Sequence, residues 1–306
     1  MSGLVFLFPG QGSQAVGMGR DLCARFPAAA ELFAQADELL GFRLSQCCFE
    51  GPEEELRQTS VTQPALFVHS LAVCRLLQDW GIEPSWVAGH SLGEYSALVA
   101  AGVFDFAAGL QLVRRRGQLM QEQRQGSMAA VLGLEDQQVI DLCAQVPGVV
   151  AANFNTPGQV VISGEVEAVL RAGKLAEAAG AKRVVQLPVS GAFHSPLMAP
   201  AARELAGLLQ GMEFRTPPVP VLTNVAAVPV SDPRQLQQQL IDQMTSPVRW
   251  TAIMQCLAGL GVESALEVGP GSVLRGLARR AAPQVKVAGA GTAEEIAALG
   301  GGQKDG

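Results

Sequence analysis

The fold of this chain is indicated most clearly by one stretch, Trp86-Val87-Ala88-Gly89-His90-Ser91-Leu92-Gly93. A short apolar run that predicts a strand leads into the pattern G-x-S-x-G, and a helix is predicted over 94–101. This is the setting of a nucleophile elbow, in which two glycines allow a tight turn that exposes the serine hydroxyl. The free N–H groups at the start of the helix would face a developing oxyanion. The alternative interpretation is an ordinary strand-to-helix turn that Ser91 caps.

Strands and helices alternate on both sides of this stretch. Residues 4–8 form a continuous apolar run that ends at Pro9-Gly10 and predicts a buried strand. Helical spacing of apolar residues predicts helices over 26–40 and 64–80. We interpret 95–113, the most apolar long stretch, as buried helix and turn, because Asp105 and several glycines interrupt it. The alternation favours an α/β fold with a mainly parallel sheet.

The pattern changes near residue 125. The predicted order is strand 128–132, helix 136–145, strands 149–153 and 159–163, helix 166–180 and strand 183–187. This β-α-β-β-α-β order is typical of a ferredoxin-like module. We therefore expect a small inserted domain at 126–188 within a large domain made of 1–125 and 189–306. The large domain would resume with strand 219–223, helix 232–244 and strand 265–268, and 300–306 is predicted to be a loose tail.

Composition excludes several classes of protein. The 306 residues are 48% hydrophobic and 16% charged, which is typical of a packed core. The net charge is −6 and the longest basic run is Arg114-Arg115-Arg116, so nucleic-acid binding is not expected. The six cysteines form no C-x-x-C pair, so we expect no metal site and reduced thiols in the cytoplasm. The apolar N-terminus has no basic residues before it, which argues against a signal peptide. We also expect no membrane span, and a monomer.

A nucleophilic serine needs a base, and the chain has three histidines. His69 falls inside a predicted helix, and His90 is adjacent to Ser91, where neighbouring side chains point apart. His194, in a loop after the predicted small domain, is therefore the favoured base. No carboxylate stands out as its partner, so a backbone carbonyl is an alternative.

Two further segments are candidates for the same site. Gly10-Gln11-Gly12 follows the first strand, and the N–H of Gln11 is a candidate second oxyanion donor, although this segment taken alone favours a simple tight turn. The three consecutive arginines 114–116 fan over about 200° of a helix, at roughly 100° per residue. One of them can therefore face the site while the others are solvated, and the default alternative for such a run is a wholly solvated helix face.

Seven motifs stand in an order that resembles malonyl-CoA:acyl carrier protein transacylases. They are the segments 8–14 (Phe-Pro-Gly-Gln-Gly-Ser-Gln), 63–65 (Gln-Pro-Ala), 89–95 (Gly-His-Ser-Leu-Gly-Glu-Tyr), 116–117 (Arg-Gly), 153–155 (Asn-Phe-Asn), 191–195 (Gly-Ala-Phe-His-Ser) and 267–271 (Glu-Val-Gly-Pro-Gly). The resemblance covers about residues 4 to 285. It implies an α/β-hydrolase-like large domain with a ferredoxin-like insertion, and transfer of malonyl between malonyl-CoA and acyl carrier protein without a metal or redox cofactor.

The resemblance also implies residue roles. Ser91 would be the nucleophile, His194 the base, and the N–H groups of Gln11 and Leu92 the oxyanion hole. Arg116 would bind the malonyl carboxylate by two parallel hydrogen bonds. Gln63 would line the acyl pocket, and the main-chain carbonyl of Gln243 would orient the histidine. Asn153 and Asn155 would line the thioester channel. Phe193 is bulky and would crowd an α-methyl group.

The type of reaction and the identity of the carrier both remain open at this point. A serine thioesterase or other hydrolase uses the same elbow, whereas a stand-alone polyketide acyltransferase or a malonyl-loading subunit of malonate decarboxylase differs in the carrier. Acyl carrier proteins are generally acidic and this chain is acidic, so docking requires a local basic patch. The candidate docking residues are Lys182, Arg183, Arg279 and Arg280, with Arg275 nearby.

Overall fold

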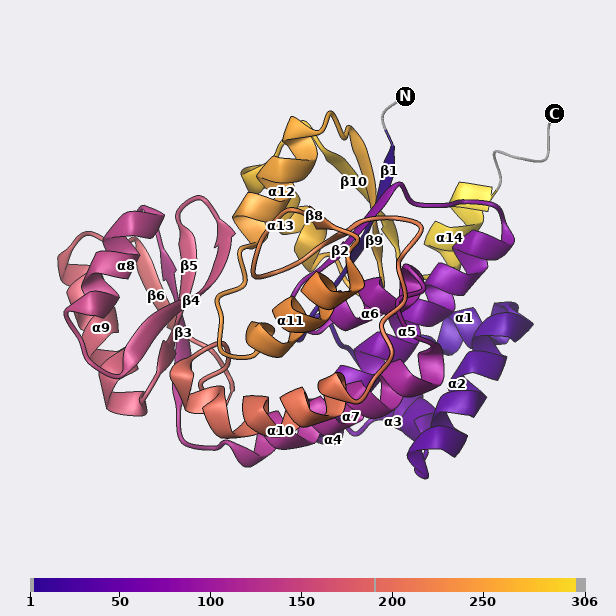
Figure 1. The fold of residues 1–306 in the computed structure, drawn as a ribbon, viewed down its shortest axis with the longest axis horizontal. Helices are drawn as coiled ribbons and strands as arrows, with labels where there is room; N and C mark the ends of the chain where they lie inside the picture. Colours follow the sequence, from indigo (N-terminus) through magenta and orange to yellow (C-terminus); the bar gives the residue numbers. More distant parts are fainter. Residues whose placement is uncertain (1–2, 190, 301–306) are drawn as a thin grey trace.

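A six-stranded sheet forms the centre of the larger part of the molecule (Figure 1). The computed structural model describes residues 3–189 and 191–300. The strands are β1 (Leu4–Phe8), β2 (Trp86–Gly89), β7 (Val221–Leu222), β8 (Pro229–Val230), β9 (Ser264–Val268) and β10 (Lys286–Ala290). Their order is β10-β9-β1-β2-β7-β8, and every pairing is parallel except that of β7 with β8. The predicted mainly parallel sheet is confirmed.

Helices pack on both faces of this sheet and bury apolar side chains in two clusters. They are α1 (Arg20–Arg25), α2 (Pro27–Leu40), α3 (Leu44–Glu50), α4 (Glu53–Leu56), α5 (Thr59–Asp79), α6 (Gly93–Ala100), α7 (Phe106–Glu122), α10 (Ala199–Gln210), α11 (Pro233–Gln243), α12 (Trp250–Gly259), α13 (Val273–Ala281) and α14 (Ala293–Gly300), with a 3₁₀ turn at Pro196–Met198. Helix α5 alone, among the described residues, is long and apolar enough to span a membrane, but 89% of its apolar window is buried inside the protein. It is therefore a core helix.

A separate antiparallel sheet carries the small unit, at the left of Figure 1. Its strands are β3 (Ser127–Leu132), β4 (Val149–Thr156), β5 (Gln159–Gly164) and β6 (Arg183–Gln186), in the order β4-β5-β3-β6, with helices α8 (Asp136–Ala144) and α9 (Val166–Ala178). The chain order β-α-β-β-α-β is the predicted one, so the predicted fold class is confirmed. The exact domain limits at 126 and 188 stay a prediction.

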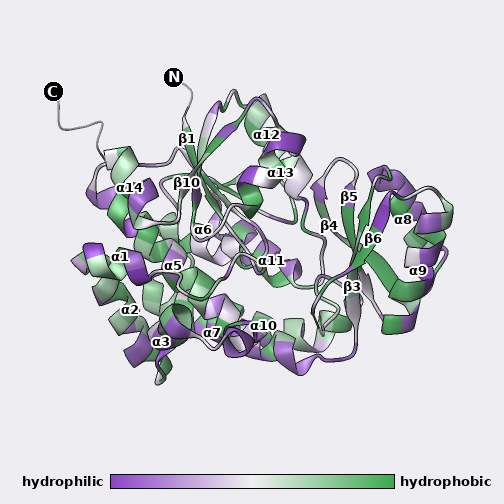
Figure 2. Cartoon of the chain, turned by 180° about the vertical axis from the view of Figure 1, so that it is seen from behind, coloured by the Kyte–Doolittle hydropathy of each residue, from purple (hydrophilic) through white to green (hydrophobic). Residues whose placement is uncertain are grey.

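Alternation along β3 explains how the small sheet joins the rest. Ala129 and Val131 belong to the apolar cluster beneath α8 and α9, whereas Met128 and Ala130 belong to the large core. Successive strand residues point to opposite faces, so one strand contributes to two cores. Figure 2 shows largely hydrophobic strands, and helices that mix hydrophobic and hydrophilic residues.

The small unit is also joined to the large unit through its backbone. The N–H of Phe154 donates to the Val248 carbonyl at 2.9 Å, and the N–H of Val248 donates to the Ala152 carbonyl at 2.8 Å. These bonds hold β4 beside the segment that follows α11, and thereby place the asparagines of β4 next to the large unit.

Several element limits differ from the sequence prediction. The helix predicted from Pro64 begins at Thr59, so Pro64 lies inside α5. There it removes one backbone hydrogen bond and crowds the carbonyl four residues earlier, and the burial of most of α5 outweighs this cost. The strand predicted over 219–223 is shortened to Val221–Leu222. Gly300 ends α14, and the rest of the predicted tail, 301–306, lies outside the described residues.

Candidate active site

Ser91 lies on a sharp turn between β2 and α6. Its φ is 52°, in the left-handed region that serine rarely adopts. A Cβ on Gly89 would lie 1.9 Å from the Gly93 carbonyl carbon, and one on Gly93 would lie 2.0 Å from the Phe8 oxygen. Only glycine fits at either position, so the G-x-S-x-G pattern forms the predicted elbow and is not an ordinary turn.

Asn224 fastens this elbow from behind. Its Oδ1 accepts from the Ser91 N–H at 2.7 Å, and its Nδ2 donates to the Gly89 carbonyl at 2.6 Å. The side chain is fully buried just after β7, the neighbour of β2 in the sheet. Sequence reasoning missed Asn224 because a lone asparagine carries no motif, and only the pairing of β2 with β7 brings the two segments together.

His194 is paired with Ser91. Its Nε2 lies 2.7 Å from Ser91 Oγ, and its Nδ1 lies 3.0 Å and 3.1 Å from the carbonyl oxygens of Gln243 and Ser246. Carbonyl oxygens only accept, so Nδ1 carries the proton and the lone pair of Nε2 is directed at the hydroxyl. Two backbone carbonyls thus orient the imidazole through Nδ1, in the position that a carboxylate occupies in many serine enzymes.

His194 is neutral over a wide range of pH. Burial, with a smaller effect of the Arg116 charge, lowers its pKa to about 3. A neutral imidazole can accept the proton of Ser91 at neutral pH. The other histidines do not contact the serine hydroxyl: His90 pairs with Asn155 Oδ1 at 2.8 Å, and His69 is buried in α5.

Arg116 is fully buried beside the serine. Its Nη2 lies 3.2 Å from Ser91 Oγ and 3.1 Å from Gln243 Oε1, and its Nη1 donates to Gln63 Oε1 at 2.9 Å. The guanidinium also lies over the Tyr95 ring, 5.1 Å from its centroid. Among the described residues no carboxylate pairs directly with it. Neutral amide oxygens hold it, so its charge is available to an anionic ligand.

The other two arginines of the run face elsewhere, as the helical fan predicts. Arg114 donates to the Leu40 carbonyl and lies over the Phe42 ring, whereas Arg115 pairs with Glu204 and Glu122 at the surface.

A cavity of about 160 Å³ contains these groups. Gln243 does not line this cavity but contacts Arg116 and Ser91 from behind it. All the other predicted site residues line it: Gln11, Gln63, Ser91, Leu92, Arg116, Asn153, Asn155, Phe193 and His194. Within the described part of the chain, the backbone N–H groups of Gln11 and Leu92 make no hydrogen bond. Both are therefore free to donate to an oxyanion beside Ser91.

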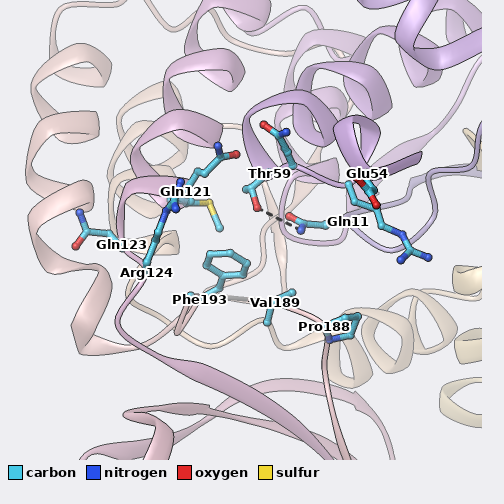
Figure 3. A pocket seen from close by; sticks show the side chains of 13 residues that line it. Gln11, Glu54, Thr59, Gln121, Gln123, Arg124, Pro188, Val189 and Phe193 are labelled. Carbon is cyan, nitrogen blue, oxygen red and sulfur yellow. Dashed lines mark hydrogen bonds between the residues drawn. The ribbon is translucent and has the colours of Figure 1, made fainter. Parts of the chain in front are cut away.

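A second cavity of about 390 Å³ adjoins the first and shares four of its lining residues, Gln11, Met120, Val189 and Phe193. Figure 3 shows the Gln11 side chain pointing toward Thr59, with Phe193 and Val189 beside it. Arg57 and Arg124, both exposed, line the outer part. The two cavities therefore share one wall, and the larger one is lined partly by exposed side chains.

The described residues include no cluster of three His, Cys, Asp or Glu side chains that could hold a metal ion. All six cysteines are free thiols.

Comparison with known proteins identifies the family. The model of the acyl transferase domain matches residues 5–305. The chain belongs to the acyl transferase family. Within this acyl transferase family, the chain is 47% identical over 287 residues to the malonyl CoA-acyl carrier protein transacylase of Escherichia coli K12, covering 92% of this chain and 93% of the relative. The Bacillus subtilis protein of the same name is 44% identical over 303 residues, covering 97% and 96%.

Solved structures of acyl transferases agree closely with this fold. An acyl carrier protein S-malonyltransferase from Vibrio cholerae superposes with a TM-score of 0.94 at 46% identity, covering 97% of this chain and 99% of that one. A malonyl-transacylase in complex with its type II PKS acyl-carrier protein gives a TM-score of 0.95 at 43% identity, covering 99% and 100%. The α/β architecture with an inserted small sheet is therefore that of malonyltransferases.

Proposed function

We propose that this chain transfers malonyl from malonyl-CoA to the phosphopantetheine thiol of an acyl carrier protein, for fatty acid biosynthesis, through an ester on Ser91. The single observation that carries the proposal is the buried Arg116, whose Nη2 lies 3.2 Å from Ser91 Oγ without a carboxylate partner. A buried cation at the nucleophile fits an acyl group that carries its own carboxylate.

In the first half-reaction, Ser91 Oγ attacks the thioester carbonyl while His194 Nε2 takes the hydroxyl proton. The oxyanion of the tetrahedral intermediate accepts from the N–H groups of Gln11 and Leu92. When the intermediate collapses, the C–S bond breaks, and His194 returns the proton to the coenzyme A sulfur. The products are malonyl-Ser91 and the free thiol of coenzyme A.

In the second half-reaction, the thiol of the carrier attacks the ester and gives its proton to His194. Collapse breaks the bond between the acyl carbon and Ser91 Oγ, which takes the proton back. Throughout, Arg116 holds the malonyl carboxylate, which fixes the acyl carbon against the nucleophile. Phe193 lines the cavity beside Ser91 and would crowd a branched acyl group, which favours malonyl over methylmalonyl.

The carrier docks, in this proposal, on exposed basic residues. Lys182 precedes β6 and Arg183 begins it. Arg279 and Arg280 lie in the last turn of α13, where Arg280 reaches Gln159 of the small unit at 3.5 Å. None of the four lines the two cavities at Ser91. They would therefore position the carrier, while its flexible arm enters the larger cavity. The monomeric state and the cytoplasmic location stay predictions.

The proposal is tested by incubating the protein with malonyl-CoA and a holo acyl carrier protein and separating the products. Malonyl-carrier formed at the rate of coenzyme A release supports transfer. Free malonate released at the same rate with or without carrier would instead show a hydrolase, and malonyl transfer only to a malonate decarboxylase or polyketide carrier would change the pathway.

A further inference from the structure

A buried carboxylate outside the proposed chemistry lies directly behind the site. Glu94 is in the first turn of α6 and is fully buried. Its Oε2 accepts from Gln243 Nε2 at 2.8 Å and from the Asn224 N–H at 3.1 Å, and its Oε1 has no partner in the described part of the chain. Burying a carboxylate without a direct ion pair costs stability, so packing alone does not account for Glu94.

Gln243 is the centre of this arrangement. Its Nε2 donates to Glu94 Oε2 and to the Ser91 carbonyl at 2.9 Å. The Ser91 carbonyl can only accept, and Glu94 Oε2 already accepts from the Asn224 N–H, so the amide nitrogen faces both and Oε1 faces Arg116. The reverse orientation would place two donors against the guanidinium and an oxygen against two oxygens.

We propose that Glu94 is a positioning residue that holds the Gln243 amide in the orientation that aims Arg116 at the malonyl carboxylate. This inference rests on the proposed function. Arg116 donates to two amide oxygens, those of Gln63 and Gln243, and without the Gln243 oxygen its Nη2 would keep only the contact with Ser91 Oγ. The side chain of Glu94 thus controls acyl selectivity without touching substrate.

A second contact of Glu94 separates this role from a structural one. Through its bond to the Asn224 N–H, Glu94 also supports the residue that fastens the elbow. Disturbing the elbow slows every acyl donor, because each is attacked by Ser91. Disturbing Arg116 slows donors that carry a carboxylate most, because only their carboxylate binds the guanidinium. The ratio of malonyl to acetyl acylation therefore isolates the path through Gln243.

Two conservative variants of Glu94 separate the effect of side-chain length from the effect of charge. Glu94→Gln can place its carbonyl oxygen where Oε2 lies and keep both hydrogen bonds, with its NH₂ in the position of the unpartnered Oε1. Glu94→Asp keeps the charge but is shorter by one methylene, so it cannot accept from both donors. We expect the malonyl-to-acetyl ratio to fall about tenfold or more in Glu94→Asp and to stay within about threefold of the parent in Glu94→Gln.

The measurement is the rate at which Ser91 is acylated by malonyl-CoA and by acetyl-CoA, with far-UV circular dichroism to select folded variants. In a Gln243→Met background, Glu94→Asp should not change the ratio further, because both substitutions act on one path. Equal slowing of both donors in Glu94→Asp, equal ratio loss in the two Glu94 variants, or independent effects in the double variant would each overturn the proposal. Acylation of Ser91 needs no carrier. Failure of transfer to carrier would therefore refute the proposed function, while the ratio of malonyl to acetyl acylation could still be measured.

Discussion

Arg116→Ala is the substitution that most directly tests acyl recognition. The parent cavity places a guanidinium with no exposed surface 3.2 Å from the nucleophile. Without it, the malonyl carboxylate would be buried unpaired, and removing one partner of a buried pair costs about 3–5 kcal/mol. We therefore expect kcat/KM for malonyl-CoA to fall roughly a hundredfold to a few thousandfold. Acetyl-CoA has no carboxylate, so its kcat/KM should change by about tenfold or less.

The assay is steady-state transfer with each thioester and a common carrier, expressed as the ratio of the two values of kcat/KM. Arg115→Ala is the matched control, because it removes the same side chain one residue earlier on α7, where it pairs with Glu204 at the surface. Surface pairs contribute little, so this control should keep both the rate and the ratio. An unchanged ratio in Arg116→Ala would refute the assigned role of Arg116.

Substitutions at the base, at the docking surface and at the buried His69 have distinct expected effects. His194→Ala should slow transfer about a hundredfold or more, the usual range for lost acid–base help, whereas folded His69→Leu should keep most activity; equal losses would refute the choice of base. Reversing the charge of the four basic docking residues should raise KM for the carrier and flatten its salt dependence, with little change in KM for malonyl-CoA; unchanged carrier binding at low salt would place the docking surface elsewhere. Burial lowers the pKa of His69 to about 4 from 6.5, so the unfolded chain binds more protons as the pH falls through this window, and stability is lost. Urea unfolding at about pH 7.5 and about pH 5 should show that this loss is smaller by about 2 kcal/mol in His69→Leu, and an identical pH dependence in the two proteins would contradict it.

Local pattern was enough to predict the parts of the site that depend on neighbours in sequence. The elbow around Ser91 needs glycine at two fixed positions for steric reasons, and such a requirement is visible in the chain itself. The helical fan of 114–116 showed that only one arginine could face inward. The choice of His194 over the other histidines agrees with its 2.7 Å contact to the serine.

The supporting groups could not be predicted in this way. Asn224, Ser246 and Glu94 act through contacts that join segments more than fifty residues apart, and each is a common residue type without a motif of its own. Family resemblance assigned a role to Gln243, but its orienting carbonyl depends on backbone geometry at the end of α11, which side-chain identity does not determine. The short helices α3 and α4 were missed because four to seven residues give too little periodicity.

The proposed reaction passes malonyl through an ester on Ser91. It is tested most directly by incubating the protein with malonyl-CoA, quenching with acid before carrier is added, and locating the adduct by peptide mass spectrometry. We expect one malonyl group, on the peptide that contains Ser91, which disappears when holo carrier is added and is absent in Ser91→Ala. Malonyl found on another residue, or at an equal level in Ser91→Ala, would contradict it.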